Sequence, residues 1–406
     1  MTGDRETCDG KAQMTSLQLT LWETPDDGQG RARDTNAVGI YDQAPRFVFF
    51  GTKKSRDNGA KRKAGEQAAS AQPVMVKPST RSRRMIKRDF DFGGATYGVT
   101  IRPVLIERRG SDGEMTELEV YPGEREQIVE EVIRRIATER ARLRLSKEDR
   151  IQMDFSLYEV LEELRRVGHG LNLQELKEAL TILHLASIQI KAVGAGGEEL
   201  LHSSAFPVMA LASRAGAEGE RQVERTYLEF NPLVAKAIRQ LQFHRLDYEC
   251  LMRIDNPASR WLYKRLAWGI QNGEENLSIS ATQIVRNSGM TPWSRLRAML
   301  SWITKACEAL IEKGILASVE KDIIKNGAAY VDINYVLIPS EHFLGQMRIA
   351  RALAQHDAAE VKRITGSTKA PDQFVRIDHE TAVTTRRKRR KVLSAETEAV
   401  LPLIAE

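Results

Sequence analysis

The 406-residue chain has only three cysteines, Cys8, Cys250 and Cys307, and no two of them form a C-x-x-C pair. Such sparse cysteines exclude a disulfide framework and fit a reducing cytosol, where Cys250 and Cys307 are expected to be small core residues. No apolar run reaches the roughly 18 residues of a membrane span, and the N-terminus has no charged-then-apolar signal pattern. The sequence therefore predicts a cytoplasmic protein with no membrane partner.

Signatures of catalysis are missing as well. The sequence contains no G-x-x-x-x-G-K-[ST] loop, which an ATPase of the P-loop class would need to hold phosphate. Its seven histidines include no H-x-H or H-E-x-x-H pair, the usual spacing of a metal-dependent nuclease or protease site. We therefore expect a protein that is not an enzyme, with no catalytic residue, no metal and no cofactor.

Positive charge is concentrated in a few places. The chain has 61 basic and 55 acidic residues, a net charge of +6. Residues 51–91 alone contain twelve Lys and Arg against four acidic residues, and residues 386–391 are all basic. Such clusters predict salt-dependent affinity for nucleic acid, and the alternative is that they only keep the tails soluble.

Hydrophobic periodicity divides the chain into four parts. The two ends are polar and are expected to be disordered or flexible and basic, whereas the middle carries the patterns of strands and helices. The predicted parts are a disordered segment 1–83, a first domain 84–225, a second domain 226–345 and a flexible tail 346–406.

An internal repeat, at residues 151–190 and 277–321, is the strongest indication of fold. Each copy opens with a short strand and a capping box, in which a serine is followed three residues later by Glu or Gln: Ser156 with Glu159, and Ser280 with Gln283. Each first helix then ends at a glycine, Gly168 or Gly289. A longer helix and β-branched residues follow. This order predicts an α+β protein with two tandem winged-helix (helix-turn-helix) domains.

Charge distinguishes the two copies. Residues 112–200 carry 12 basic and 19 acidic side chains, whereas residues 258–326 carry 10 basic and 6 acidic ones. A phosphate backbone repels the first set and attracts the second. The second domain is therefore predicted to read DNA, and the first to pack against protein in an accessory or dimerisation role.

The longer helix of the second copy has an apolar stripe and an opposite polar face. The residues predicted to meet base edges or phosphates from that helix are Thr291, Ser294, Arg295, Arg297, Ser301 and Lys305. Those predicted to contact phosphate from the preceding helix and from the β-ribbon are Arg286, Asn287, Lys321 and Lys325. The alternative is an ordinary solvated face.

A short apolar patch, Gln18 to Trp22, stands alone in the polar N-terminal segment, with nothing nearby in sequence to pack on. Such a patch has the form of a peptide that orders on a partner. It matches the Q-L-x-L-F type pentapeptide by which bacterial proteins dock on the replicative sliding clamp, with tryptophan in place of the usual phenylalanine. We predict that Gln18, Leu19, Leu21 and Trp22 bind the clamp.

Several pieces, in this order, resemble the TrfA-like plasmid replication initiators and, more distantly, the wider class of iteron-binding initiators. They are QLTLWE, VFFGTKK, DFSLYEVLEELRRVG, FHRLDYECLMRIDNPASRWLYKRL and WSRLRAMLSWITKACEALIEKGIL. The resemblance implies a non-enzymatic initiator that binds repeated origin DNA (iterons), helps to open an AT-rich region and recruits the host helicase, initiator and clamp.

The resemblance also implies that the second winged helix reads the major groove with a helix at 291–313. The first would support dimerisation, with 173–186 as its matching helix. Such an initiator is active as a monomer and is inactive, or autorepresses, as a dimer. Two alternatives stay open: a plasmid-borne winged-helix repressor with no initiator activity, and a conjugative nicking enzyme, for which we expect no magnesium-dependent cleavage.

Overall fold

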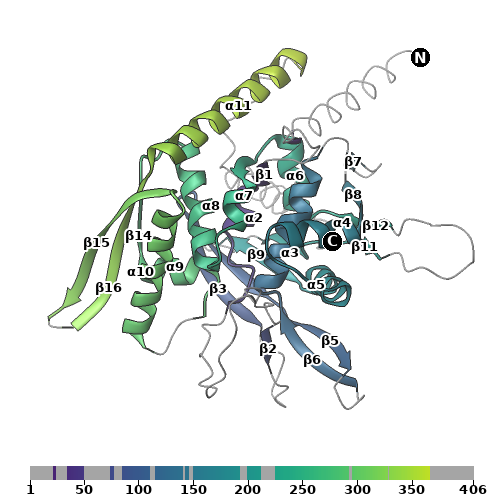
Figure 1. The fold of residues 1–406 in the computed structure, drawn as a ribbon, viewed down its shortest axis with the longest axis horizontal. Helices are drawn as coiled ribbons and strands as arrows, with labels where there is room; N and C mark the ends of the chain where they lie inside the picture. The colour runs from purple at the N-terminus through teal and green to yellow at the C-terminus, as the bar shows by residue number, and fades with distance from the viewer. Residues whose placement is uncertain are drawn as a thin grey trace, which may run out of the picture. The chain divides into compact units, whose positions relative to one another are not determined.

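The chain folds into short antiparallel sheets packed with helices, as the computed structural model in Figure 1 shows. The structure describes residues 22–23, 34–49, 74–76, 85–109, 115–139, 142–145, 150–192, 199–211, 225–291, 295–327 and 329–365. All of them belong to one compact unit, Met1–Ser367, so the predicted boundary at residue 225 stays a prediction. Within the described part, no helix combines the length and apolar character needed to cross a membrane.

The second copy of the repeat has the expected order of elements. Helix α8 (Pro257–Gln271) is followed by β14 (Leu277–Ser280), α9 (Ala281–Ser288), α10 (Leu296–Glu312), β15 (Leu316–Asn326) and β16 (Ala329–Pro339). Strand β16 lies between β14 and β15 in one three-stranded sheet. The Ser280–Gln283 capping box is present, and Gly289 adopts a left-handed φ of 88° after α9. Both local predictions are confirmed.

The first copy has the same local order. Strand β8 (Ile151–Ser156) leads into α4 (Leu157–Arg166), α5 (Leu173–Leu185), β9 (Ile188–Ala192) and β10 (Glu199–Ser203). The Ser156–Glu159 capping box forms, and Gly168 has a φ of 85°. Helix α5 therefore occupies nearly the range that the resemblance implied for it.

The strands of the first copy pair differently from those of the second. The hairpin β9–β10 does not return to β8; it extends the hairpin of β3 (Ile86–Phe92) and β4 (Ala95–Ile101), in the order β10-β9-β4-β3. Strand β8 pairs instead with β7 (Leu143–Leu145) and β12 (Arg225–Glu229), and β12 also pairs with β11 (Met209–Ala210). The ribbon after α5 is therefore part of a larger sheet and is not a separate wing.

Part of the N-terminal segment is built into the fold, so the prediction of disorder is wrong for residues 34–49. Strand β1 (Asp34–Ala37) pairs with β13 (His244–Asp247), and α2 (Gly39–Gln43) packs on α8. Strand β2 (Val74–Val76) pairs with β6 (Met115–Tyr121), which also pairs with β5 (Val104–Arg109). The partners of β1 and α2 lie about two hundred residues away in the sequence, so local periodicity could not predict these contacts.

The flexible tail was predicted to start at residue 346, but residues 346–365 are helical. Helix α11 runs over Glu341–Thr365 and buries Phe343, Met347 and Ala350. The ring of Phe343 lies 5.8 Å from that of Tyr263, centroid to centroid. Only these three of the described side chains in α11 are buried, and many of the others are polar or charged. The composition of this segment therefore resembled that of a flexible tail.

Helix α3 (Glu124–Ala137) links these parts through buried ions. Asp42 of α2 accepts hydrogen bonds from Arg134 over 2.6 Å and from Lys264 of α8 over 3.0 Å. All three side chains are at most 5% exposed. Burial acts to raise the pKa of Asp42, but Arg134 and Lys264 outweigh it and hold this pKa well below its usual range. The ion cluster therefore ties α2, α3 and α8 together.

The remaining helices are short. Helix α6 (Pro232–Gln240) starts at an Asn231 cap, and α7 (Tyr248–Met252) starts at an Asp247 cap.

Candidate nucleic-acid interface

Helix α10 and its N-cap carry four of the ten residues that were predicted to meet DNA. Leu300, Ile303 and Cys307 are buried on the inner face, whereas Arg297, Ser301 and Lys305 are exposed. Arg295 is the N-cap residue of α10, and its side chain makes no capping hydrogen bond. Basic and hydroxyl side chains thus gather at the beginning and along one side of this helix, as expected.

One of the residues predicted at the start of the helix, Thr291, lies outside it. Helix α10 begins at Leu296, not at residue 291 as the resemblance implied. Thr291 is partly buried, and its backbone amide donates to the Phe49 carbonyl over 2.8 Å. Thr291 therefore belongs to the turn that precedes the helix. Ser294 lies outside the described residues.

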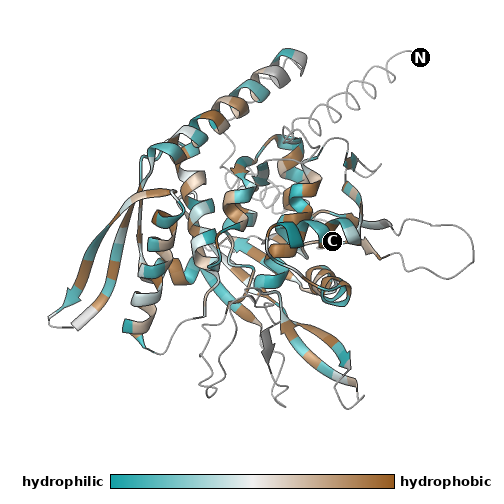
Figure 2. Cartoon of the chain, viewed as in Figure 1, coloured by the Kyte–Doolittle hydropathy of each residue, from teal (hydrophilic) through white to brown (hydrophobic). Residues whose placement is uncertain are grey.

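The hairpin β15–β16 forms a long exposed arm beside α10. Lys321 and Lys325 are exposed on β15, and Lys321 Nζ lies 3.1 Å from Glu308 Oε1 of α10. Ile323, Ile324 and Val331 are between 43% and 48% exposed. Figure 2 shows apolar and polar segments interleaved along this hairpin. Exposed apolar side chains beside cations are typical of a contact surface.

The two residues predicted on α9 are less available to DNA than expected. Asn287 is only 5% exposed and lies on the inner face of α9, so the prediction that it touches phosphate is wrong. Arg286 is exposed, but it forms an ion pair with Asp91 of β3. An anion must compete with this carboxylate before Arg286 can bind it.

In the first copy, the helix that corresponds to α10 is covered. Val104 and Leu118 of the hairpin β5–β6 share one buried cluster with Ile182 of α5 and with Ala186, the C-cap residue of this helix. On the same helix, Glu178 pairs with two arginines from other elements. Helix α5 therefore lacks an open basic face, and the two copies present different surfaces.

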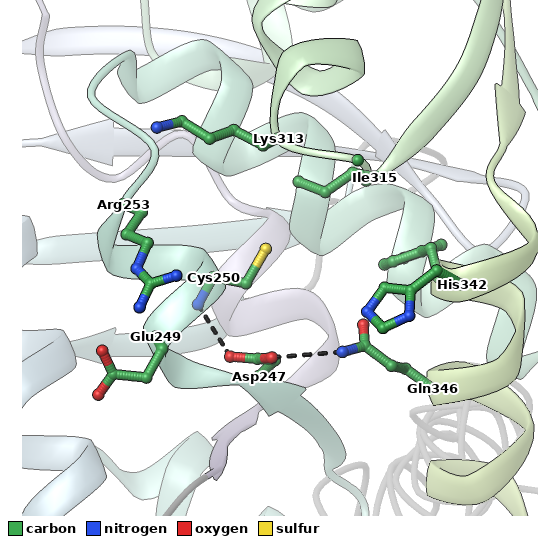
Figure 3. A pocket seen from close by; sticks show the side chains of 10 residues that line it. Asp247, Glu249, Cys250, Arg253, Lys313, Ile315, His342 and Gln346 are labelled. Carbon is green, nitrogen blue, oxygen red and sulfur yellow. Dashed lines mark hydrogen bonds between the residues drawn. The ribbon is translucent and has the colours of Figure 1, made fainter.

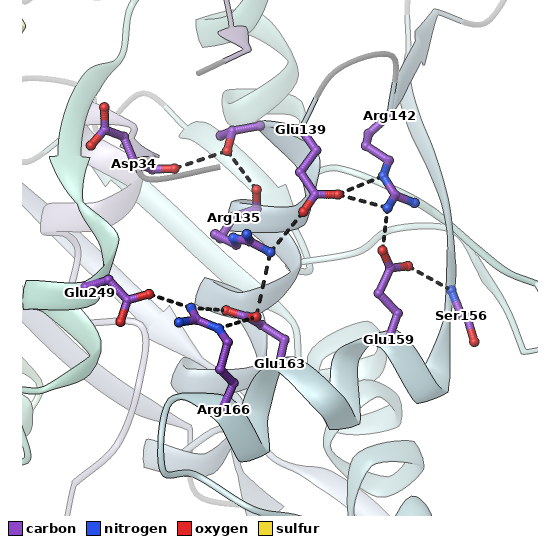
Figure 4. A network of polar contacts seen from close by, with 10 residues as sticks. Asp34, Arg135, Glu139, Arg142, Ser156, Glu159, Glu163, Arg166 and Glu249 are labelled. Carbon is purple, nitrogen blue, oxygen red and sulfur yellow. Dashed lines mark hydrogen bonds and ion pairs between the residues drawn. The ribbon is translucent and has the colours of Figure 1, made fainter. Parts of the chain in front are cut away.

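Much of the acidic charge of the first copy is paired within the protein. Arg142 contacts Glu139 over 2.8 Å and also pairs with Glu159, and Arg166 contacts Glu163 over 2.7 Å and Glu249 over 2.5 Å (Figure 4). Glu124 and Glu131 of α3 also pair with Arg260 and Lys264 of α8. Because Arg260 and Lys264 lie outside residues 112–200, these two pairs offset part of the negative charge counted there.

A pocket of about 200 Å³ lies where α7 and the end of α10 meet α11 (Figure 3). Asp247 accepts hydrogen bonds there from the Cys250 amide, at 2.8 Å, and from Gln346, at 3.3 Å. Burial, followed by the nearby Asp247, raises the pKa of Cys250 to about 11. Its thiol is therefore protonated at neutral pH and is a poor nucleophile.

Cys250 and Cys307 were both expected to be small core residues. Cys307 is fully buried in the core, whereas Cys250 is only partly buried. In the described ranges, no group of three or more His, Cys, Asp or Glu side chains is arranged to hold a metal ion.

No protein-family model and no curated protein matches the chain. Its structure is similar to two crystal structures of domains 2 and 3 of RctB. One has 10% identity and a TM-score of 0.39 and covers 64% of this chain and 94% of that one; the other has 9% identity and a TM-score of 0.37 and covers 66% and 96%.

A third similar structure is the Pi initiator protein in complex with iteron DNA, with 12% identity and a TM-score of 0.37, covering 53% of this chain and 91% of that one. Similarity at this level assigns neither a function nor a site to the present chain. The resemblance to TrfA-like initiators therefore stays a prediction.

Proposed function

We propose that residues 257–339 form a winged helix that binds double-stranded DNA by sequence, with α10 in the major groove and the hairpin β15–β16 as the wing. One observation carries this proposal: the exposed basic face of α10 lies beside an exposed arm that bears Lys321 and Lys325. An α-helix fits the major groove, where arginine can bond guanine with two hydrogen bonds. The wing cations then hold phosphates and fix the register.

A direct test is selection of bound sequences from a random duplex pool, followed by titration of the selected duplex and a scrambled one. We expect specific binding at least about 10³-fold tighter than binding to the scrambled duplex at physiological salt, as for other specific DNA-binding proteins. Equal affinity for both duplexes would contradict the proposal.

The finer proposal is a plasmid replication initiator that binds origin repeats, opens the origin and recruits the host helicase and initiator. It is supported by the ordered sequence pieces described above and by the exposed basic face of α10 beside the hairpin β15–β16. The rival is a transcriptional repressor with the same winged helix. Adding the protein to a supercoiled plasmid that carries its repeats distinguishes them, because an initiator makes AT-rich bases reactive to a single-strand probe and a repressor does not.

Self-association belongs to the same proposal. The first domain would hold two copies together in an inactive or autorepressing dimer, while the monomer initiates. The hairpin β5–β6 covers helix α5, which leaves this helix unsuited to DNA and favours a protein-binding role for the first domain. Sedimentation of the protein with and without its repeats would show whether DNA selects the monomer.

Docking on the host sliding clamp through residues 18–22 is a separate proposal, and burial of Trp22 limits it. Trp22 is fully buried, with its ring 4.7 Å from that of Phe243, and its carbonyl accepts a hydrogen bond from Asn36. The expectation that this patch stands alone is wrong for Trp22, because its ring packs on a residue that is far away in the sequence. Gln18, Leu19 and Leu21 lie outside the described residues. Clamp binding by Trp22 therefore requires that its ring leave this core.

The clamp proposal is tested by titrating purified clamp with the wild type and with Gln18→Ala, which changes the peptide and spares the buried ring. Loss of clamp binding and of plasmid establishment, with DNA binding unchanged, is the expected result. Establishment that survives this change and also Leu19→Ala would count against a clamp role.

The ion pair between Arg286 and Asp91 gives a prediction about DNA affinity. Changing Asp91 to Asn should release Arg286 for phosphate and raise affinity for any duplex, with the salt slope steeper by about 1. Asp89→Asn is the matched control, because Asp89 is exposed on the same strand and has no such partner in the described part of the chain. Salt titrations of both variants on random DNA provide the measurement. A similar gain from Asp89→Asn would show only a general charge effect.

A further inference from the structure

A segment from the N-terminal part of the chain holds the turn between α9 and α10. This segment, residues 44–49, is called the strap here, and it runs beside residues 289–291. The Phe49 amide donates to the Gly289 carbonyl over 3.1 Å, and the Thr291 amide donates to the Phe49 carbonyl over 2.8 Å. Helix α10 begins only a few residues later. The strap thus holds residues 289–291, which follow α9 and precede α10.

The strap is also fastened to the first domain at several points. The Val48 amide donates to the Pro122 carbonyl over 2.9 Å, just before α3. Arg46 forms a buried ion pair of 2.5 Å with Glu130 of α3. Arg88 of β3 donates from one nitrogen to the Phe47 carbonyl at 2.9 Å and to the Pro45 carbonyl at 3.2 Å. The turn before α10 is therefore tied, through the strap, to β3 and α3.

At Gly289 the backbone lies too close to the strap to leave room for a side chain. Its φ is 88°, and a Cβ atom there would lie 2.4 Å from the Phe47 carbonyl oxygen. Gly168 stands at the corresponding place after α4, with a φ of 85° and no atom within 4 Å of a built Cβ. Alanine would strain the backbone at both positions, but only at Gly289 would it also push the strap away. The two glycines separate these effects.

We propose that the strap is a positioning element for DNA recognition, which sets the angle at which α10 presents its basic face to the groove. The inference rests on the proposed function of residues 257–339. Loss of the strap leaves the surface cations in place, so electrostatic affinity for any duplex is retained. Base contacts depend on geometry and are lost. The strap therefore governs discrimination more than total affinity.

The test compares four variants of the full chain: Gly289→Ala, Gly168→Ala, Arg88→Met and Arg88→Lys. The measured quantity is the ratio of Kd for a random duplex to Kd for the selected duplex, at one salt concentration and a temperature where circular dichroism shows each variant folded. We expect Gly289→Ala and Arg88→Met to lower the ratio by about tenfold or more, as the loss of a base contact would. Gly168→Ala should leave it unchanged, and Arg88→Lys should restore most of it.

Amide hydrogen exchange of the free protein gives a second readout that does not depend on DNA. Gly289→Ala and Arg88→Met should speed exchange at Thr291 and in the first turn of α10, while Gly168→Ala should not. Equal exchange in the two alanine variants would show that the strap does not hold the turn. Faster exchange with an unchanged Kd ratio would show that the turn does not set the reading angle. Either result overturns the inference.

Failure of the proposed function has a different signature. If the wild-type protein binds all duplexes equally, the proposed function is contradicted. The difference in amide exchange between Gly289→Ala and Gly168→Ala would still be observed, because it does not depend on DNA. If Gly289→Ala does not fold, the two Arg88 variants carry the comparison, because Arg88 is only partly buried and lies outside the helix-turn-helix.

Discussion

Replacing Arg295 by alanine is expected to weaken binding to the selected duplex by roughly 1 to 3 kcal/mol, about 5- to 150-fold, with little change on random DNA. Arg295 caps the start of α10 without a side-chain capping bond, so its guanidinium is available to a base and its loss should cost the fold little. Titration of both duplexes at one salt concentration is the measurement.

Two further variants sharpen this result. Arg295→Lys keeps the charge but removes the planar fork, so it should lose most of the specific affinity and retain the non-specific affinity. Lys325→Ala should weaken all duplexes alike and flatten the salt slope by about 1, because a wing cation meets phosphate. If Arg295→Ala and Lys325→Ala cause equal losses on both duplexes, α10 is not the reading helix.

Replacing Asp42 by Asn should destabilise the fold by about 3 to 5 kcal/mol, the usual cost of removing one partner from a buried ion pair. The substitution keeps the shape of the side chain but leaves Arg134 and Lys264 without their shared carboxylate. Because these residues come from α2, α3 and α8, a single cooperative transition should shift. Denaturant unfolding followed by circular dichroism measures the change.

The control for Asp42 is Glu249→Gln. Glu249 pairs with Arg166 over 2.5 Å, but its side chain is 40% exposed, so its loss should cost no more than about 1 kcal/mol. Equal losses from the two substitutions would mean that the buried ions of α2, α3 and α8 do not hold these elements together.

The same carboxylate predicts a pH dependence. The pKa of Asp42 is lowered in the folded protein, so its contribution to stability is full above the unfolded pKa of about 4 and is lost as the pH falls below that value. The stability of the wild type should therefore fall more steeply below about pH 4 than that of Asp42→Asn. Parallel curves for the two proteins would contradict this explanation.

The local features of the repeat could be predicted from the sequence. A capping box needs only residues three apart, and both boxes formed at Ser156 and Ser280. The left-handed glycines and the exposed face of α10 follow from equally short spacings. The prediction failed at Asn287 because α9 is too short for its polar composition to show which side faces inward.

The sequence by itself determined the order strand, helix, turn, helix in both copies of the repeat and the exposed basic face of α10, because caps, turns and periodicity depend on neighbouring residues. Only the tertiary structure decided that the ribbon of the first copy joins β3–β4, that α5 is covered, and that a buried Trp22 and the strap belong to the core. Each of these features depends on residues that are far apart along the chain. Asp42 and Lys264, for example, are 222 residues apart. Such pairings are set by which surfaces meet when the elements pack, and no short window of sequence contains both sides.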